Sequence, residues 1–221
     1  MWKEKAIDYR RFRLDRLNTP EFKHLKYLLF WPVYGFFFLL VERLWIRESY
    51  TPIHCPLDDQ IPFCEYFLIP YLLWFVFLIG IQIYTLLYDT ESFIKFMKFI
   101  MVSYSLAIII YMLFPNCQEL RPMVFERDNL FTKFLEGFYQ FDTNTNVCPS
   151  IHVIGSVAVM ICGWNCKSLN TPGWRIFLGI SAFLISISTV FLKQHSVLDI
   201  LAAIPVCIAA VSYTHLTLPT T

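Results

Sequence analysis

Charged side chains are scarce in this sequence. Asp, Glu, Lys and Arg make up only 16% of the 221 residues, whereas about 25% is usual in soluble domains. Hydrophobic residues contribute 57%, and the mean hydropathy is +0.52. The shortage of charge excludes an ordinary water-soluble domain and indicates that lipid is the main solvent of this protein.

Disulfide and metal frameworks also lack support. The seven cysteines are an odd number and do not indicate a disulfide scaffold. His54 and Cys55 lack the paired spacing of a structural zinc site, and no cage of carboxylates accompanies the motifs described below. We therefore expect neither a bound metal nor a cofactor.

Individual cysteines still have expected roles. Three lie in or near apolar runs, where thiols act as small packing groups: Cys162, Cys166 and Cys207. Cys55 and Cys64 bracket a loop, whereas Cys117 and Cys148 flank two motifs, so either pair could form a disulfide outside the cell. The spacing leaves both pairs open.

Six apolar stretches are long enough, or nearly so, to cross a bilayer as helices, which takes roughly 20 apolar residues. They are residues 27–45, 66–88, 96–114, 151–165, 174–192 and a run that starts at Val197. The fourth and sixth look short, but each can extend through polar residues at its end. The sequence therefore predicts an all-α integral membrane protein that folds as a six-helix bundle.

The distribution of basic residues predicts an orientation. Eight of the 18 Lys and Arg residues fall within the first 26 positions, a segment too charged for the apolar core of a signal peptide. With this end in the cytoplasm, the inner side also receives Lys95 and Lys98, in a loop between the second and third spans, and holds more basic residues than the outer side. The positive-inside rule then predicts that segments 46–65, 115–149 and 193–196 face outward.

A nucleic-acid-binding arm is the alternative explanation of the basic segment. The segment runs directly into an apolar helix and mixes Asp8, Asp15 and Glu21 among its bases, a charge pattern that does not favour nucleic acid. We therefore expect residues 1–26 to be a cytoplasmic segment that orients the protein, with no nucleic-acid partner.

Residues 127–141 show a different pattern within the long outer segment. Apolar residues such as Leu130, Phe134 and Phe138 recur there at helical spacing beside charged positions. This predicts an amphipathic helix that lies on the membrane surface or caps the bundle. A packed loop helix with no role in substrate access is the plainer alternative.

Polar and ionisable residues gather at three of the predicted helix ends. The segments are 115–122 (PNCQELRP), 148–153 (CPSIHV) and 193–199 (KQHSVLD). The predicted topology places all three segments on the outer side. This topology follows from the distribution of basic residues and does not use the three segments as motifs. Because an ionisable group inside a span costs at least about 2.5 kcal/mol, such convergence indicates a functional site.

The residue types in these segments suit phosphate chemistry. His195 and Asp199 are four positions apart, so the carboxylate can hold one imidazole nitrogen and leave the other as a nucleophile or base. Pro149 suits the first turn of a helix, and the free amides of that turn can receive an anion beside Ser150 and His152.

Arg121 adds a planar guanidinium that can donate to two phosphate oxygens. Each residue alone also has a plainer role: a structural histidine, an arginine anchored to lipid headgroups, or a capping carboxylate at Asp199. Residue types alone do not decide which histidine attacks; the spacing favours His195, which has a carboxylate one helical turn away.

Together, the three clusters resemble the signature of the type 2 phosphatidic acid phosphatase superfamily of membrane phosphatases and phosphotransferases. The forms CPSIHV and QHSVLD are most similar to the branch that contains inositol phosphorylceramide synthases. Residues 58–63 (DDQIPF) and 69–71 (IPY) resemble bacterial members of that branch. The resemblance covers residues 57–208 and implies a location in a bacterial cell membrane.

The resemblance implies a role for each matched residue. His195 matches the nucleophile that forms a phosphohistidine, Asp199 matches the carboxylate that orients it, and His152 matches the acid that protonates the leaving oxygen. Arg121 and Ser150 match the phosphate cradle. The reaction of the family needs no metal.

Three positions depart from the phosphatase pattern. Phe114, Thr189 and Gln194 stand where that pattern has a lysine, an arginine and a glycine. Two positive charges expected around the phosphate are therefore missing, and Lys193 is the nearby candidate to supply phosphate charge. The same departures occur in the phosphotransferase-like branch.

These inferences predict a lipid-phosphate phosphatase that acts at the outer leaflet on a lipid phosphate or pyrophosphate. One alternative is a phosphotransferase that exchanges phosphorylated headgroups between lipids. Another is a non-catalytic lipid-phosphate binder or transporter. We expect residues 27–211 to form the membrane domain and the polar, threonine-rich residues 212–221 to be an unrelated tail.

Overall fold

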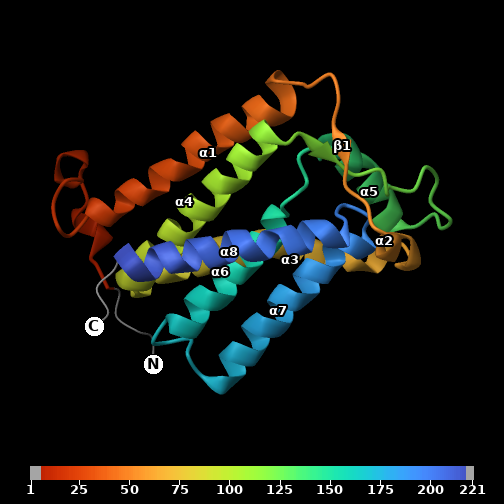
Figure 1. The fold of residues 1–221 in the computed structure, drawn as a ribbon. Coiled ribbons are helices and arrows are strands. Elements are labelled where there is room, and N and C mark those ends of the chain that lie inside the picture. Colours follow the sequence, from red (N-terminus) through yellow and green to blue (C-terminus); the bar gives the residue numbers. More distant parts are fainter. Residues whose placement is uncertain (1–5, 218–221) are drawn as a thin grey trace.

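The computed structural model describes residues 6–217, which form an all-α protein (Figure 1). Its α-helices are α1 (Phe30–Leu39), α2 (Pro56–Gln60), α3 (Leu68–Tyr88), α4 (Thr90–Leu113), α5 (Leu130–Phe141), α6 (Ile151–Asn165), α7 (Pro172–Phe191) and α8 (Val197–Thr217). The long helices pack together, and the short elements α2, α5 and β1 (Thr51–Pro52) gather at one end of the bundle, here called the motif end. A 3₁₀ segment (Lys23–Leu29) and a π-helical turn (Leu40–Leu44) extend α1.

Five helices in the described part of the chain are long and apolar enough to cross a membrane: Lys23–Leu44, Glu65–Tyr88, Thr90–Leu113, Pro172–Phe191 and Val197–Thr214. The prediction of a helical protein with long apolar segments is thereby confirmed. The fourth predicted segment forms α6, which has only 15 residues. A bundle of six spans stays a prediction.

The prediction of a loop around Lys95 and Lys98 is wrong. Both lysines lie inside α4, because this helix begins at Thr90 rather than near residue 96. The Asp89 side chain accepts a hydrogen bond from an amide of the first turn at 3.0 Å and so caps the helix. Lys95 is 2.5 Å from the Glu91 carboxylate, a pair at helical spacing.

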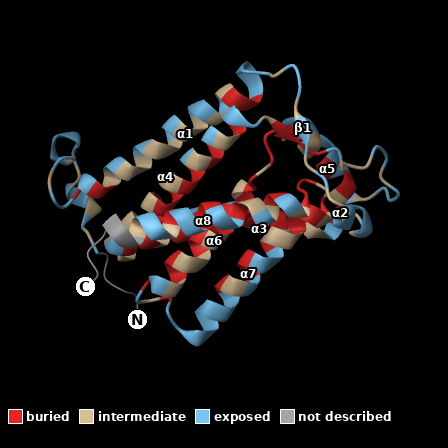
Figure 2. Cartoon of the chain, viewed as in Figure 1, coloured by how far each residue is buried: buried red, intermediate tan, exposed pale blue. Residues whose placement is uncertain are grey.

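The bundle core lies around α4 and α6. In the most apolar stretch of α4, 50% of the residues are buried. The corresponding share in the segment Lys23–Leu44 is 11%. Figure 2 shows the same contrast along α4 and α1. Val33, Phe36 and Leu39 of α1 are each more than half exposed, which suits contact with lipid tails rather than water.

Close packing around α6 depends on glycine at two positions. A β-carbon at Gly155 would lie 2.7 Å from Tyr104 Oη and 2.8 Å from Trp74 Nε1, whereas one at Gly163 would lie 2.2 Å from Leu178. A larger residue at either position would have to displace these neighbours. The glycines therefore let α3, α4 and α7 approach α6 closely.

The amphipathic helix α5 begins at Leu130 rather than at residue 127. Asn129 determines this start, because its side chain accepts hydrogen bonds from the amides of Phe131 at 2.9 Å and Thr132 at 3.1 Å. Leu135 is fully buried in a small cluster with residues of α3, while Leu130 is 81% exposed. The helix thus packs on the motif end, and its position at a membrane surface stays a prediction.

A short parallel pairing joins two loops at the motif end. β1 pairs with β2 (Asn116–Cys117), with Thr51 opposite Asn116. The amide of Ile53 continues the pairing by donating to the Cys117 carbonyl at 2.7 Å. The first motif is thereby fixed beside the segment that leads to α2.

The last helix continues beyond the apolar run. α8 extends through Thr217, past Val211, after which the composition turns polar. The hypothesis of an unrelated tail at 212–221 falls partly outside the described residues, as does the start of the basic segment at residues 1–5.

Candidate active site

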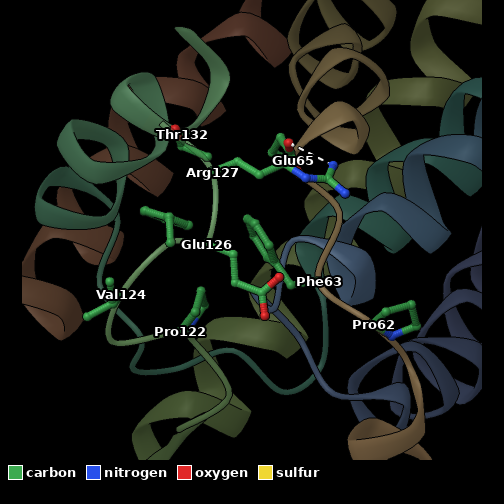
Figure 3. Close-up of a pocket in the computed structure, with 9 residues that line it drawn as sticks. Pro62, Phe63, Glu65, Pro122, Val124, Glu126, Arg127 and Thr132 are labelled. Carbon is green, nitrogen blue, oxygen red and sulfur yellow. Dashed lines mark hydrogen bonds and ion pairs between the residues drawn. The ribbon is translucent and has the colours of Figure 1, made fainter. Parts of the chain in front are cut away.

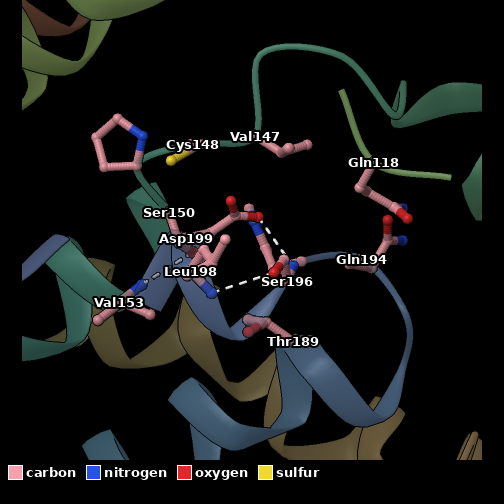
Figure 4. A network of polar contacts seen from close by, with 12 residues as sticks. Gln118, Val147, Cys148, Ser150, Val153, Thr189, Gln194, Ser196, Leu198 and Asp199 are labelled. Carbon is pink, nitrogen blue, oxygen red and sulfur yellow. Dashed lines mark hydrogen bonds and ion pairs between the residues drawn. The ribbon is translucent and has the colours of Figure 1, made fainter. Parts of the chain in front are cut away.

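The three motifs meet at the motif end. His195 lies in the turn between α7 and α8, Ser150 and His152 lie at the start of α6, and Arg121 follows β2. Figure 4 shows the polar network at this place, with Ser150 close to Asp199. The amide of Ser150 donates to the main-chain oxygen of Asp199 at 3.2 Å, which joins the second motif directly to the third.

His195 and Asp199 form the predicted pair. Nδ1 of His195 is 3.0 Å from Oδ2 of Asp199, and the two side chains are 8% and 0% exposed. The amide of Ser196 donates to the same carboxylate oxygen at 3.0 Å, so the main chain orients the acid. Because α8 begins only at Val197, His195 lies in the preceding turn. The pair leaves Nε2 of His195 on the opposite edge of the ring, as a base or nucleophile.

A residue outside the three motifs fixes this turn. Asp58 of α2 is 1% exposed and accepts hydrogen bonds from Ser196 Oγ at 2.6 Å and the Val197 amide at 2.8 Å. Burial alone would raise the pKa of Asp58, but these hydrogen bonds lower it below its usual range. Asp58 is therefore an ionised cap for the start of α8.

Ser150 and His152 occupy the start of α6. The prediction that Pro149 lies in the first turn is wrong, because the helix begins at Ile151 with Ser150 as its cap. Oγ of Ser150 accepts from the amide of Val153 at 3.5 Å, and the residue is fully buried. The hydroxyl therefore lies at a helix N-terminus, where negative charge is favoured.

Aromatic rings and His195 enclose His152. The ring centroid of His152 is 4.5 Å from that of Tyr71, 4.4 Å from that of Trp74 and 5.7 Å from that of His195. Nδ1 of His152 is buried and has no hydrogen-bond partner within residues 6–217. The two imidazoles are near enough to contact one small group from two sides.

Arg121 is held mainly by main-chain oxygens. Nη1 donates to the carbonyls of Tyr139 at 3.2 Å and Asp142 at 2.8 Å, and Nη2 donates to that of Thr143 at 2.9 Å. Nη2 also donates to Oε1 of Gln194. Nε is buried without a partner in the described part of the chain. Arg121 thus ties the end of α5 to the third motif and keeps Nε–H available for an anion.

Lys193 is turned toward a different loop. Its ammonium donates to the carbonyl oxygens of Asp58 at 2.7 Å and Ile61 at 2.5 Å. Burial lowers its pKa, although the nearby Asp58 carboxylate opposes the shift. Lys193 therefore lies beside the cap of α8, and no contact recorded among the described residues joins it to Ser150 or Arg121.

A cavity of about 40 Å³ is lined in part by both histidines. Its other polar lining residues include Gln194, Glu42 and Asp142. Burial raises the pKa of Asp142 above its usual range, which favours the neutral acid. The cavity is therefore small, and both histidines and two acidic residues line it beside apolar side chains.

No protein-family model, curated protein or solved structure matches this chain. The function is therefore inferred from the chemistry of the site and from the three motifs. The site combines a buried imidazole–carboxylate pair, a second imidazole and the start of a helix, a set of groups that can bind an anion and transfer protons.

A second hollow, of about 310 Å³, lies beside the first motif, and neither histidine lines it (Figure 3). Phe63 and Pro122 form part of its wall. In this wall, Nη1 of Arg127 is 3.2 Å from Oε1 of Glu65, whose side chain is 4% exposed. The ion pair fixes the loop after the first motif to the start of the helix Glu65–Tyr88.

All seven cysteines are free, so neither pair considered from the sequence is bridged in the structure. Burial raises the pKa of Cys148 to about 12, which keeps this thiol protonated near neutral pH and makes it a poor nucleophile. The three packing cysteines are buried as expected: Cys162, Cys166 and Cys207. Among the described residues, no group of three or more His, Cys, Asp or Glu side chains is arranged to hold a metal ion.

Two further residues of the site have no role assigned from the sequence. Glu42 is 8% exposed and lines the cavity; its position inside the first predicted span is a signal, since ionisable residues in spans are functional by default. Asn116 lies in the first motif, and its side chain donates to the carbonyl of Cys148 at 3.0 Å and accepts from the Cys148 amide at 2.8 Å. It thereby positions the second motif.

Proposed function

We propose that this chain is an integral membrane enzyme of the type 2 phosphatidic acid phosphatase superfamily, which hydrolyses a lipid phosphate or pyrophosphate through a phosphohistidine. The observation that carries the proposal is the buried His195–Asp199 pair, 3.0 Å apart, with His152 beside the same cavity. The order of the three motifs supports it, because the resemblance to the superfamily rests on these residues.

The proposed reaction has two steps. Nε2 of His195 attacks phosphorus, the bond from phosphorus to the lipid oxygen breaks, and His152 donates a proton to that oxygen. Water then attacks the phosphorus and gives a proton to His152, while the P–N bond breaks and returns its electron pair to His195. Asp199 holds Nδ1 of His195 and stabilises the positive charge that the ring acquires.

The phosphate oxygens would be bound by Ser150 Oγ, by the first amides of α6 and by Nε–H of Arg121. The other donors of Arg121 are engaged with main-chain oxygens and with Gln194. This arrangement holds the guanidinium in place before substrate binds, which lowers the entropic cost of binding.

We further propose that α6 is a sixth span and that the motif end faces outward from a bacterial cell membrane, with the N-terminus in the cytoplasm. The excess of basic residues at the opposite end supports this orientation. α5 would lie at the outer interface, where the exposed side chains of Leu130 and Phe141 can contact lipid. The lipid tails would remain in the bilayer while the phosphate group enters the site.

Release of inorganic phosphate from phosphatidic acid and from a polyprenyl pyrophosphate by the purified protein tests the proposal. The matched variants are His195→Ala and His54→Ala. His54 is exposed, is 2.9 Å from Asp59 and follows β1 at the same end of the bundle. We expect His195→Ala to abolish release and His54→Ala to retain it.

Other outcomes would point elsewhere. Equal release by wild type and His195→Ala would rule out a phosphohistidine on this residue. Exchange of labelled headgroups between lipids without net phosphate release would favour the phosphotransferase. Saturable binding of lipid phosphate without turnover would identify a binder or transporter.

A further inference from the structure

Glu42 lies on the π-helical turn Leu40–Leu44, where the first apolar helix reaches the motif end. Its side chain ends in a carboxyl group, yet the residue is only 8% exposed. Oε2 accepts hydrogen bonds from the hydroxyl of Thr143 and from that of Thr145, the latter at 3.3 Å. Oε1 has no hydrogen-bond partner among residues 6–217. One oxygen is therefore fixed by the protein, while the other remains available to a ligand.

Three more buried polar atoms that lack partners within the described chain belong to residues lining the same cavity. They are Oδ1 of Asn146, Nδ1 of His152 and Nε2 of Gln194. These residues are 6%, 8% and 2% exposed. A buried polar atom without a partner is costly, so four such atoms around one cavity indicate a polar occupant rather than simple packing.

The chemistry and size of the cavity point to a hydroxyl group. Glu42 and Asn146 offer acceptors and Gln194 offers a donor, and a hydroxyl group can both donate and accept. The cavity volume of about 40 Å³ exceeds the roughly 10–15 Å³ that one water molecule requires, so a hydroxyl group fits. The carboxyl group of Glu42 would not favour a phosphate oxygen beside it, so the phosphoryl group would lie at the two histidines and the hydroxyl group beside Glu42.

We propose that Glu42, Asn146 and Gln194 form a hydroxyl-binding subsite that positions the nucleophile of the second step, either water or a polyol. This inference rests on the proposed function. The attacking O–H group gives its proton to His152, and a second O–H group donates a hydrogen bond to Glu42. The second group is the other O–H of water or a neighbouring hydroxyl of the polyol. The attacking oxygen bonds to phosphorus, its proton moves to His152, and the P–N bond breaks with its electron pair returning to His195.

Rapid-quench kinetics with a radiolabelled lipid phosphate separates the two steps, as formation and decay of an acid-labile phosphoenzyme. Glu42→Gln keeps the shape of the side chain but presents a donor where Oε1 accepts. In Glu42→Gln, we expect decay of the phosphoenzyme to slow at least about 10-fold and its formation to slow by less than about 3-fold. Thr143→Val, which removes the hydroxyl that orients Oε2, should slow decay in the same direction by a smaller factor.

The matched control is Glu91→Gln. Glu91 is an exposed carboxylate paired with Lys95 at the start of α4, at the opposite end of the bundle. This variant should retain both rates. An unchanged decay rate in Glu42→Gln overturns the subsite and leaves the proposed function intact. Formation and decay that slow together would show that Glu42 only supports the fold, and would also overturn it.

The absence of a phosphoenzyme in the wild type overturns the proposed function, and the subsite with it. Added glycerol distinguishes the two sources of hydroxyl. A polyol subsite diverts the phosphoryl group to glycerol phosphate, and Glu42→Gln lowers that share. A water subsite yields inorganic phosphate at every glycerol concentration, and Glu42→Gln slows its release.

Discussion

Asp58 and Ser196 lie 138 positions apart in the sequence and share a hydrogen bond of 2.6 Å between Oδ2 and Oγ. This bond joins α2 to the turn that carries His195. Lys193 strengthens the same junction, since its ammonium binds the main-chain oxygen of Asp58 at 2.7 Å. The geometry of the His195–Asp199 pair therefore depends on a loop from a distant part of the chain.

Asp58→Asn should destabilise the protein and reduce turnover. The carboxylate accepts hydrogen bonds from Ser196, Val197 and Cys55, and an amide can accept at only one of its two atoms. We expect the free energy of unfolding to fall by about 1.5–3 kcal/mol near neutral pH, as for loss of a hydrogen bond to a charged group. Thermal unfolding in detergent, followed by tryptophan fluorescence, measures the change.

The stability contributed by Asp58 should vary with pH. Its native pKa lies below its usual range because of its hydrogen bonds, although burial opposes the shift. The contribution is therefore fully present above the unfolded-state pKa of about 3.9 and is lost as the pH falls through the lower native pKa. The difference between wild type and Asp58→Asn should shrink below about pH 4. A difference that does not change with pH would contradict an ionised cap.

Arg121→Lys should disrupt the motif end despite keeping the charge. The guanidinium binds the carbonyl oxygens of Tyr139, Asp142 and Thr143 at once, which a lysine ammonium cannot reproduce in the same plane. We expect phosphate release to fall at least about 10-fold. Arg127→Lys is the matched control, because Arg127 pairs with Glu65 outside the cavity. Equal losses in both variants would contradict a specific role for the contacts of the Arg121 guanidinium with the three carbonyl oxygens.

Lys193→Ala should affect stability more than phosphate binding. The ammonium binds the carbonyl oxygens of Asp58 and Ile61, so its loss should loosen the cap of α8 and lower the unfolding temperature. We expect inhibition by vanadate, a phosphate analogue, to be unchanged. Weaker inhibition at normal stability would support the sequence-based hypothesis that Lys193 supplies phosphate charge.

Gly155→Ala should destabilise the bundle although alanine favours helices. Its β-carbon would lie 2.7 Å from Tyr104 Oη and 2.8 Å from Trp74 Nε1, so these buried side chains must be displaced. Overpacking of this kind costs about 1–3 kcal/mol. Gly80→Ala in α3 is the control, because nothing lies within 4 Å of its β-carbon and helix propensity alone should stabilise it. Thermal unfolding of both variants measures the contrast, and equal stability would contradict the close packing.

The long helices could be predicted from the sequence because apolar runs of sufficient length have few other folded forms. The starts of α4 and α5 could not, since single capping side chains, Asp89 and Asn129, determine them. The His195–Asp199 contact follows from a spacing of four residues, even though the helix begins only after His195.

The partners of the long basic side chains could not be predicted. Arg121 and Lys193 can each reach several acceptors, and their choice depends on how α2 and α5 pack on the motif end. The same holds for Glu42, whose hydroxyl partners Thr143 and Thr145 lie about a hundred positions later in the chain. Contacts of this kind result from tertiary packing, which motif spacing does not encode.

The shortness of α6 bears on the depth at which the proposed chemistry would occur. Its 15 residues are about 22 Å long, roughly 8 Å less than the hydrocarbon layer of a bilayer. If the far end of α6 lies at one boundary of that layer, Ser150 and His152 lie beneath the opposite one. A phosphate group would then have to leave the hydrated headgroup zone to reach the histidines. Water is scarce at that depth. The depth of one helix end would thus limit the supply of bulk water, so breakdown of the phosphohistidine would depend on a hydroxyl group that the protein itself binds.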